Sequence, residues 1–301
     1  MAAPRTRTTE SIAEEIRERL HEMTPSERRV ARTLLATYPS AGLQSMPQLA
    51  DGAGVTGPTV LRFVRKVGFA GYPDFQRSLR AEVQARTEGL PTLYRTRGTP
   101  PRDAVVRSIH EASTKALDAT FTSSTLDDDL DAVVSLVCDP RRRLWFVGGR
   151  FSQLVARYLE AQLRLLRPGC AIVDEAPDRR IVHAMEIGKR DVLCLFDYRR
   201  YQQDTVAVGR VAAERGAVIV VFTDPWLSPA VESATHVLIS HVDSPSPFDS
   251  LVAAFALTEL ITARVVDALG AAGSARVSEL EGLHARVDGS APAPAGAGGG
   301  R

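Results

Sequence analysis

Three closely spaced cations, Arg62, Arg65 and Lys66, follow the run TGPT at residues 56–59. Guanidinium and ammonium groups donate hydrogen bonds to phosphate oxygens and to base edges, so this group of side chains suits contact with a nucleic acid. The run before them suits an abrupt helix start, because Thr56 can accept from free backbone N–H groups. Proline is tolerated in a first turn, where its missing N–H would have no partner. The pattern predicts a helix whose first turn and basic side contact DNA.

The cations can serve DNA only if the rest of their helix packs on a core. Val60, Phe63, Val64 and Val67 recur at three- and four-residue spacing, which is the period of one helical face. Gly68 follows the last of them, at a position where a left-handed residue commonly ends a helix. We therefore expect a bounded helix with one apolar face and one basic face. A basic face that is merely solvated is the alternative.

Helices on both sides of this one complete the arrangement. Thr24 and Glu27 have the capping-box pattern, and apolar residues follow them at helical spacing. Residues 47–53 predict a second, short helix, Gly54 turns the chain into the basic helix, and a further helix runs to about Ala85. A glycine-containing turn between two helices is typical of the helix-turn-helix motif, whose second helix lies in the major groove.

Residues 23–79 resemble the N-terminal domain of the RpiR (MurR/RpiR) family of bacterial transcriptional regulators. The resemblance rests on the runs MTPSERRVARTLL and QLADGAGVTGPTVLRFVRKVGFAGYPDFQRSL. It implies a dimeric repressor or activator with a C-terminal sugar-isomerase (SIS) domain that binds an effector. Two copies would bind the half-sites of a palindrome in successive major grooves. The residues expected at the DNA, the last two of them on phosphates, are Thr56, Gly57, Pro58, Thr59, Arg62, Arg65 and Lys66.

Length and composition fit two folded units. At 301 residues, with 44% hydrophobic and 24% charged residues, the chain is typical of a globular protein of about two domains. The net charge of +1 means that DNA affinity must come from a local basic patch. Cys138, Cys170 and Cys194 lie far apart, and the sequence has neither an apolar run of membrane-spanning length nor a signal-peptide core. We expect a cytoplasmic protein without metal or cofactor.

Turn-forming residues divide the chain. We expect a helix-turn-helix domain over 10–88, a linker over 89–102, an effector-binding and dimerisation domain over 103–287 and a flexible tail over 288–301. In the effector-binding domain, two amphipathic helices precede short β-rich runs that alternate with helices. This alternation predicts a five-stranded parallel sheet in a flavodoxin-like order with helices on both faces. The fold class is therefore an all-α domain followed by a three-layer α/β domain, in which ligands bind at the carboxyl ends of the strands.

Two loops lie at that edge of the sheet. The first has the sequence VGGRFS, whose glycines let the backbone approach a ligand in front of a helix with free N–H groups. It is similar to the first SIS motif, in which Gly-x-Gly-x-Ser follows the first strand. Gly148 and Ser152 match that motif, whereas Arg150 stands where the second glycine is expected. Together with Gly149, these residues are candidates for effector contact.

The second loop, FDYRRYQQDT, departs from the family pattern. SIS domains that hold sugar phosphates usually carry a Ser-x-Ser-Gly-x-Thr run there, whose hydroxyls and amides bind the phosphate. Here Asp197, Arg199, Arg200 and Gln202 replace Ser, Ser, Gly and Thr. If Arg150 converges with the two other arginines, their forked donors would suit a carboxylate or another anion. The alternative is that Asp197 pairs with one arginine and the others are solvated.

A last helix is expected over residues 248–269, with Ser246 or Asp249 as its cap. Ser246 is also a candidate for the mouth of the pocket. Apolar residues cover more than one face of this helix, which predicts both core packing and a subunit contact.

Two classes of function follow. The first is a ligand-responsive regulator, not an enzyme, that acts as a homodimer or tetramer on an operator away from membranes and senses a small anion, either a sugar phosphate, a sugar acid or another carboxylate. The second is a SIS-type sugar-phosphate isomerase. The altered loop counts against the isomerase, as does the absence of an acid–base pair among four isolated histidines, His110, His183, His236 and His241. A nucleotide-binding enzyme is weaker still, since a full G-x-G-x-x-G run is missing.

Overall fold

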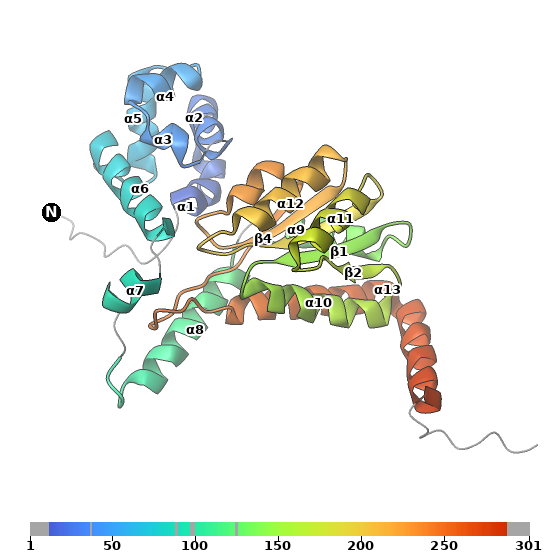
Figure 1. The fold of residues 1–301 in the computed structure, drawn as a ribbon. Coiled ribbons are helices and arrows are strands. Elements are labelled where there is room, and N and C mark those ends of the chain that lie inside the picture. The colour runs from blue at the N-terminus through green and yellow to red at the C-terminus, as the bar shows by residue number, and fades with distance from the viewer. Residues whose placement is uncertain (1–11, 37, 88–89, 97–99, 124–125, 288–301) are drawn as a thin grey trace, which may run out of the picture.

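The computed structural model describes residues 12–36, 38–87, 90–96, 100–123 and 126–287. The predicted tail lies outside these ranges. The described chain forms an all-helical N-terminal unit and a C-terminal unit built on one sheet, which confirms the predicted fold class (Figure 1).

The N-terminal unit is a small bundle of helices around its own core. It contains α1 (Ile12–Glu18), the 3₁₀ turn η1 (Leu20–Glu22), α2 (Pro25–Ala36), α3 (Ser40–Leu43), α4 (Met46–Gly52), α5 (Gly57–Lys66) and α6 (Tyr72–Thr87). The capping box predicted for α2 is present, because the Thr24 N–H donates to Glu27 Oε2 at 2.9 Å and the Glu27 N–H donates to Thr24 Oγ1 at 3.4 Å. Helices α1 and α3 were not expected from the sequence.

Helix α5 packs on this core through the predicted apolar stripe. Val60, Phe63, Val64 and Val67 are completely buried. Positive φ angles at Gly54 (60°) and at Gly68 (91°) mark the turn before the helix and the left-handed residue after it. Since such angles are strained for residues with a Cβ, both glycines are required by the backbone.

One detail of the predicted helix start is wrong. The Thr56 side chain accepts no hydrogen bond from the first turn, although its backbone takes the N-cap position. Its hydroxyl instead lies 3.3 Å from the hydroxyl of Thr59, the two side chains being neighbours on the same face. Thr59 is itself 6% exposed, so it belongs with the buried side of the helix.

The C-terminal unit follows the expected alternation of strands and helices. Its sheet has the order β2-β1-β3-β4-β5 with every pair parallel, as predicted. After α7 (Leu90–Thr96), which lies between the two units in the sequence, the elements are α8 (Val105–Phe121), α9 (Leu126–Cys138), β1 (Arg143–Gly148), α10 (Ser152–Leu166), β2 (Cys170–Ile172), α11 (Pro177–Glu186), β3 (Asp191–Phe196), α12 (Gln203–Glu214), β4 (Val218–Thr223), η2 (Pro229–Ser233), β5 (His236–Ile239) and α13 (Val252–Val287). Helix α7 lies inside the segment expected to be a linker.

Side chains of successive strand residues enter two different cores, because they point to opposite faces of the sheet. Leu144 and Phe146 of β1 pack with residues of α9, α10 and α13, whereas Trp145 and Val147 pack with residues of α12 and η2. Figure 1 shows α10 and α13 on one face of the sheet and α11 and α12 on the other. The result is the expected three-layer arrangement.

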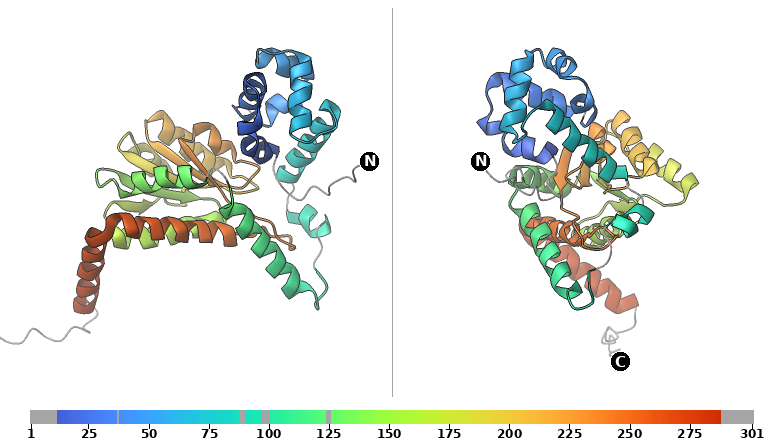
Figure 2. Two further views of the ribbon diagram at one scale, coloured as in Figure 1. Left: turned by 180° about the vertical axis from the view of Figure 1, so that it is seen from behind. Right: turned by 90° about the vertical axis from the view of Figure 1, so that its left-hand side faces the viewer.

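The last helix differs from its prediction at both ends. Neither Ser246 nor Asp249 caps it, because it begins at Val252, whose N–H donates to Ser250 Oγ at 3.3 Å. It continues past Gly270, where the backbone is kinked (φ 47°, ψ −123°), and the segment beyond the kink turns away from the sheet (Figure 2). The apolar pattern ends near this kink, so it did not reveal the second segment. In the described part of the chain, even this long helix lacks an apolar stretch able to span a membrane.

Candidate functional site

The exposed side of α5 carries part of the predicted DNA-contact group. Thr56, Pro58, Arg62 and Arg65 are exposed, and Gly57 is partly so. Arg62 also donates from Nη2 to the Thr59 hydroxyl at 3.3 Å, so Thr59 supports Arg62 from behind. The structure thus brings a first turn and two arginines to one side of the helix.

Lys66 has an internal role that the sequence pattern did not reveal. Its Nζ lies 3.1 Å from Glu27 Oε2 and 2.7 Å from the backbone carbonyl oxygen of Glu22. Burial of the Glu27 carboxyl works to raise its pKa, but hydrogen bonds from Thr24 and Lys66 outweigh burial and hold that pKa below its ordinary value. The ammonium group therefore connects the end of α5 to the start of α2 through an ion pair and a hydrogen bond.

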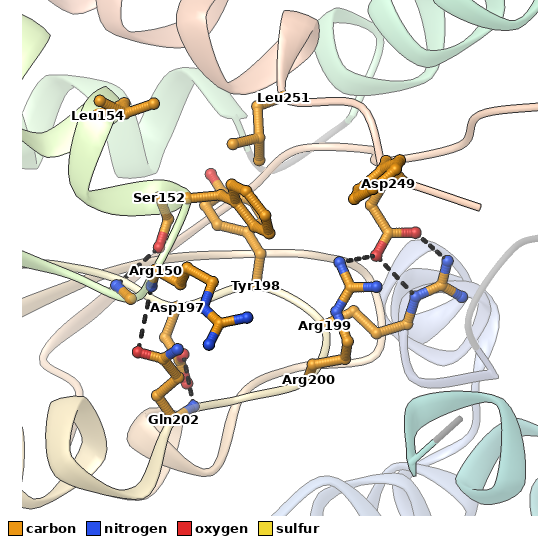
Figure 3. Close-up of a pocket in the computed structure, with 13 residues that line it drawn as sticks. Arg150, Ser152, Leu154, Asp197, Tyr198, Arg199, Arg200, Gln202, Asp249 and Leu251 are labelled. Atoms are coloured by element: carbon orange, nitrogen blue, oxygen red, sulfur yellow. Dashed lines mark hydrogen bonds and ion pairs between the residues drawn. The ribbon is translucent and has the colours of Figure 1, made fainter. Parts of the chain in front are cut away.

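A pocket of about 530 Å³ opens beside the carboxyl ends of β1 and β3 (Figure 3). Most of the predicted effector residues line it, but Gly148 and Ser246 do not. The predicted residues in its wall are Gly149, Arg150, Ser152, Asp197, Arg199, Arg200 and Gln202. The sequence reasoning missed Phe151, Leu154, Tyr198, Phe248, Asp249 and Leu251. Four of these six are apolar, and polar residue types were the signal that had been sought.

The first loop folds on itself through its own polar groups. The Gly149 N–H donates to Ser152 Oγ at 2.9 Å, and that hydroxyl donates to the Phe196 carbonyl at 2.7 Å. Gly148 is required for a steric reason, since a Cβ there would come within 2.5 Å of the Gln153 backbone nitrogen. Gly148 therefore shapes the loop from outside the pocket.

The Asp197 carboxylate is buried where the second loop enters α12. Its Oδ1 accepts the Gln202 N–H at 3.1 Å, and its Oδ2 accepts the hydroxyl of Ser228. Burial raises the pKa of Asp197 to about 7, against the opposing effect of these two hydrogen bonds. Gln202 in turn accepts the Arg150 N–H through Oε1 at 3.1 Å, which connects the two loops.

Arg199 and Arg200 converge on Asp249 and not on open space. Arg199 forms a buried ion pair with Asp249, and Arg200 Nη2 lies 3.2 Å from Asp249 Oδ2. The Arg199 guanidinium also lies 4.5 Å from the ring centre of Trp226. The expected convergence of three arginines is therefore limited to two, and their carboxylate partner is Asp249 where the sequence had suggested Asp197.

Arg200 has a strained backbone. Its φ is 72°, a left-handed value that is uncommon for residues with a Cβ. In the family pattern a glycine is expected at this position, and glycine adopts such an angle freely. Its Nη1 is buried without a hydrogen-bond partner in the described structure. Strain and an unused donor together favour a binding role for this loop.

The histidines considered as catalysts stand apart from the pocket lining. His183 accepts the Asp174 N–H at 3.0 Å through Nδ1 and packs against the Trp145 ring. His241 lies 3.7 Å from an Asp243 carboxylate oxygen. The two pocket carboxylates, Asp197 and Asp249, are both engaged by neighbouring donors. The arrangement suits binding of a ligand more than proton transfer.

A helix-turn-helix unit joined to a parallel sheet with a pocket at the carboxyl ends of its strands is typical of DNA-binding regulators. Residues 10–86 match the helix-turn-helix domain of the rpiR family, and residues 139–264 match the SIS domain. The chain belongs to the RpiR family of helix-turn-helix transcriptional regulators with a SIS domain.

Curated relatives and solved structures agree with this assignment. The chain is 29% identical over 263 residues to the HTH-type transcriptional regulator HexR of Pseudomonas aeruginosa, covering 86% of this chain and 87% of that protein. It is 27% identical over 245 residues to HexR of Escherichia coli, covering 79% and 80% of the two chains. The sugar isomerase domain of an RpiR transcription factor from Sphaerobacter thermophilus has the same fold, with a TM-score of 0.56 at 24% identity over 60% of this chain and 99% of that one.

Proposed function

We propose that this chain is a ligand-responsive regulator that binds a specific operator through α5. Its affinity for the operator changes when a small anion occupies the pocket. The observation that carries the proposal is the exposed pair Arg62 and Arg65 beside a free helix start, in a domain of the RpiR type. A guanidinium in the second turn of a recognition helix, as Arg62 is in α5, can bind base edges, and one a turn later, as Arg65 is, can reach the phosphates.

The operator proposed is an inverted repeat bound by two copies. Each copy of the chain would present one recognition helix, α5, with two exposed arginines, Arg62 and Arg65. Because one such helix reads only a few base pairs, two helices in successive major grooves are needed for specific binding. The two HexR relatives are HTH-type transcriptional regulators by name, which supports the DNA-binding role and not the symmetry of the operator.

The effector is proposed to be a small anionic metabolite. Arg150 is exposed and lines the pocket, Arg200 has an unused buried donor, and the glycine loop before α10 lets a ligand come close to the backbone. A ligand can change DNA binding only if it favours one arrangement of the domains over another.

An isomerase remains the second candidate, and the pocket gives it little support. Sugar isomerisation requires a base and an acid that can reach the substrate. Asp197 accepts hydrogen bonds from Gln202 and Ser228, while Asp249 is bound by two arginines. We therefore propose that the chain has no isomerase activity.

Footprinting and fluorescence anisotropy with DNA from the protein's own promoter region test the regulator. Arg62→Ala should weaken specific binding by ~1–3 kcal/mol and relax sequence preference, and Arg65→Ala should mainly reduce the salt dependence. Arg141→Ala removes the same charge and is the control, because Arg141 is an exposed residue just before β1 in the C-terminal unit and does not belong to the DNA-contact group. Diffuse binding that is equally sensitive to all three changes would contradict the proposal, and turnover of sugar phosphates would support the isomerase.

A further inference from the structure

We infer that the pocket selects an amphipathic monocarboxylate, with an aromatic or branched apolar body, in preference to a sugar phosphate. This inference rests on the proposed function and names the chemical class of its effector. It depends on four features of the pocket: amides that already donate to carboxyl groups of the protein, two arginines that share Asp249, the guanidinium of Arg150, and an apolar wall.

Two of the amides at the start of α12 donate to the protein's own carboxyl groups. Asp197 accepts the Gln202 N–H at 3.1 Å, and Asp204 accepts the Thr205 N–H at 2.8 Å. Free N–H groups at a helix start are what a bound phosphate uses. Asp204 also pairs with Arg180, and Asp197 stands where the family pattern places a hydroxyl, so a phosphate would have to displace the protein's own carboxyl groups from these two amides.

Two of the three pocket arginines share a single carboxylate within the protein. Arg199 and Arg200 share Asp249, and the side chains of Arg199 and Asp249 are only 4% and 7% exposed. A buried ion pair is costly to break, because each charge would be left without its partner. The charge that these arginines offer to a ligand is therefore reduced to about one unit between them and their acid.

Arg150 supplies a positive charge that is not paired with a carboxylate of the described residues. Its guanidinium points toward the centre of the group of pocket side chains in Figure 3, between Tyr198 and Gln202. In the described ranges no carboxylate lies within ion-pair distance of it. One free guanidinium matches one carboxylate, which it can bind with two parallel hydrogen bonds.

The rest of the wall is apolar and partly exposed. Phe151, Leu154 and Phe248 line the pocket at exposed fractions of 43%, 60% and 44%. The rings of Phe151 and Phe248 meet edge to face with centroids 6.3 Å apart. Sugar hydroxyls would find few partners on this surface, whereas an apolar body would cover it and remove its apolar area from water.

Isothermal titration of the full chain without DNA tests the inference. The probes are phenylacetate, 4-methylvalerate, gluconate, glucose 6-phosphate and phenylacetamide, the last being the neutral counterpart of the first. Phenylacetate or 4-methylvalerate should bind saturably, with phenylacetamide at least about tenfold weaker than phenylacetate because it lacks the charge-assisted hydrogen bonds. Glucose 6-phosphate that binds more tightly than both apolar carboxylates overturns the inference, as does no binding by either of them.

Variants assign the binding to the wall described. Arg150→Ala should weaken carboxylate binding by about tenfold or more, and Phe151→Ala should weaken it while leaving gluconate unchanged. Arg157→Ala, an exposed arginine on the same helix α10 that pairs with Glu175, is the matched control and should bind like the parent. Equal loss in Arg150→Ala and Arg157→Ala overturns the inference. So does a change of oligomeric state in Phe151→Ala without a change in affinity, because the apolar wall would then be a subunit contact.

The two proposals fail in different ways. Titration without DNA measures the pocket alone, and operator binding without ligand measures α5 alone. If a carboxylate binds and operator affinity does not change, the proposed regulation is contradicted and the proposed ligand class is supported. Release of the operator by glucose 6-phosphate, and not by phenylacetate or 4-methylvalerate, would keep the regulation and overturn the ligand class.

Discussion

The Tyr94 ring meets the Phe248 ring edge to face, with the two centroids 6.3 Å apart and the planes at 83°. Tyr94 belongs to α7, in the segment that joins the two units, and Phe248 is part of the pocket wall. Phe248 also meets Phe151 at the start of α10. A ligand that moves Phe248 therefore acts on the connecting segment by direct contact, and one that moves Phe151 acts through Phe248.

Tyr94→Ala should weaken the coupling between ligand and operator while changing neither affinity by itself. One aromatic pair contributes ~0.5–1.5 kcal/mol, so the factor by which ligand alters operator affinity should fall by about two- to tenfold. The measurement is operator anisotropy with and without saturating carboxylate. Tyr94→Phe keeps the ring and should retain the coupling. An unchanged factor in Tyr94→Ala would show that the signal takes another route.

Lys66→Ala should destabilise the N-terminal unit. The change leaves Glu27, which is 5% exposed, without its cation, and an unpaired buried charge costs ~1–3 kcal/mol or more. Urea unfolding followed by circular dichroism measures the loss. Because the depressed pKa of Glu27 stabilises the fold at neutral pH, the difference from the parent should shrink as pH falls through that pKa.

The double variant Glu27→Gln with Lys66→Ala separates stability from DNA contact. Glutamine keeps the capping box of α2 and removes the unpaired charge, so part of the lost stability should return. If operator affinity returns with it, Lys66 acts through the fold. If affinity stays low in a stable double variant, Lys66 binds phosphate as the sequence alone had suggested.

The sheet was predictable because its signals are local. The five strands and their parallel order agree with the prediction, because short β-rich runs between helices are typical of parallel pairing. Positive φ at Gly54 and Gly68 likewise follows from a residue type with a known backbone preference. Each of these features depends on neighbours in the sequence.

The partners of the charged side chains were not predictable, because they come from distant parts of the chain. Asp249 was expected to cap a helix, yet it pairs with Arg199, 50 residues away. Lys66 was expected to face DNA, and it binds Glu27 across 39 residues. Periodicity shows which face of an element is buried but does not show which charged side chain of another element packs against it. The apolar wall around Phe151 escaped notice for a related reason, since its side chains resemble core residues.

Arg200→Gly should relieve the backbone strain at this position and at the same time remove the ion pair between Arg200 and Asp249. A left-handed φ costs roughly 1–3 kcal/mol for a residue with a Cβ, and glycine adopts it freely. The ion pair to Asp249 is partly exposed on the arginine side and contributes less than this. We therefore expect a net rise in the thermal unfolding midpoint. Arg200→Ala, which loses the ion pair and keeps the strain, is the control and should be less stable than the parent.

Gly148→Ala should damage the ligand site without touching the ligand. The added Cβ would lie 2.5 Å from a backbone nitrogen and 2.6 Å from a backbone carbon of the α10 start, and backbone cannot yield as a flexible side chain does. The loop that carries Arg150 must shift, so carboxylate binding should fall by about tenfold or more while operator binding without ligand is kept. Gly282→Ala, in the last segment of α13 where nothing lies near the added Cβ, should behave like the parent in both titrations.

Asp197 should make stability fall as pH rises from about 4 to about 7. Burial raises the pKa of Asp197 to about 7 in the folded state, while the unfolded chain has the ordinary value of roughly 4. Between these values the folded protein holds a proton that the unfolded chain has lost, so this group favours folding at the acid end and loses that contribution as pH rises. Burial raises the pKa of Asp224 to about 6, which acts in the same direction.

Asp197→Asn removes this titration and keeps an acceptor for the Gln202 N–H. Relative to the parent, the variant should gain stability steadily between about pH 4 and pH 7, at up to ~1.4 kcal/mol for each unit, and the difference should level off above. Urea unfolding at half-unit intervals measures it, and taking the difference cancels the other titrating groups. A difference that is constant with pH would mean that Asp197 is ionised in the folded protein throughout. Its carboxylate would then repel a bound phosphate at every pH at which the operator is tested.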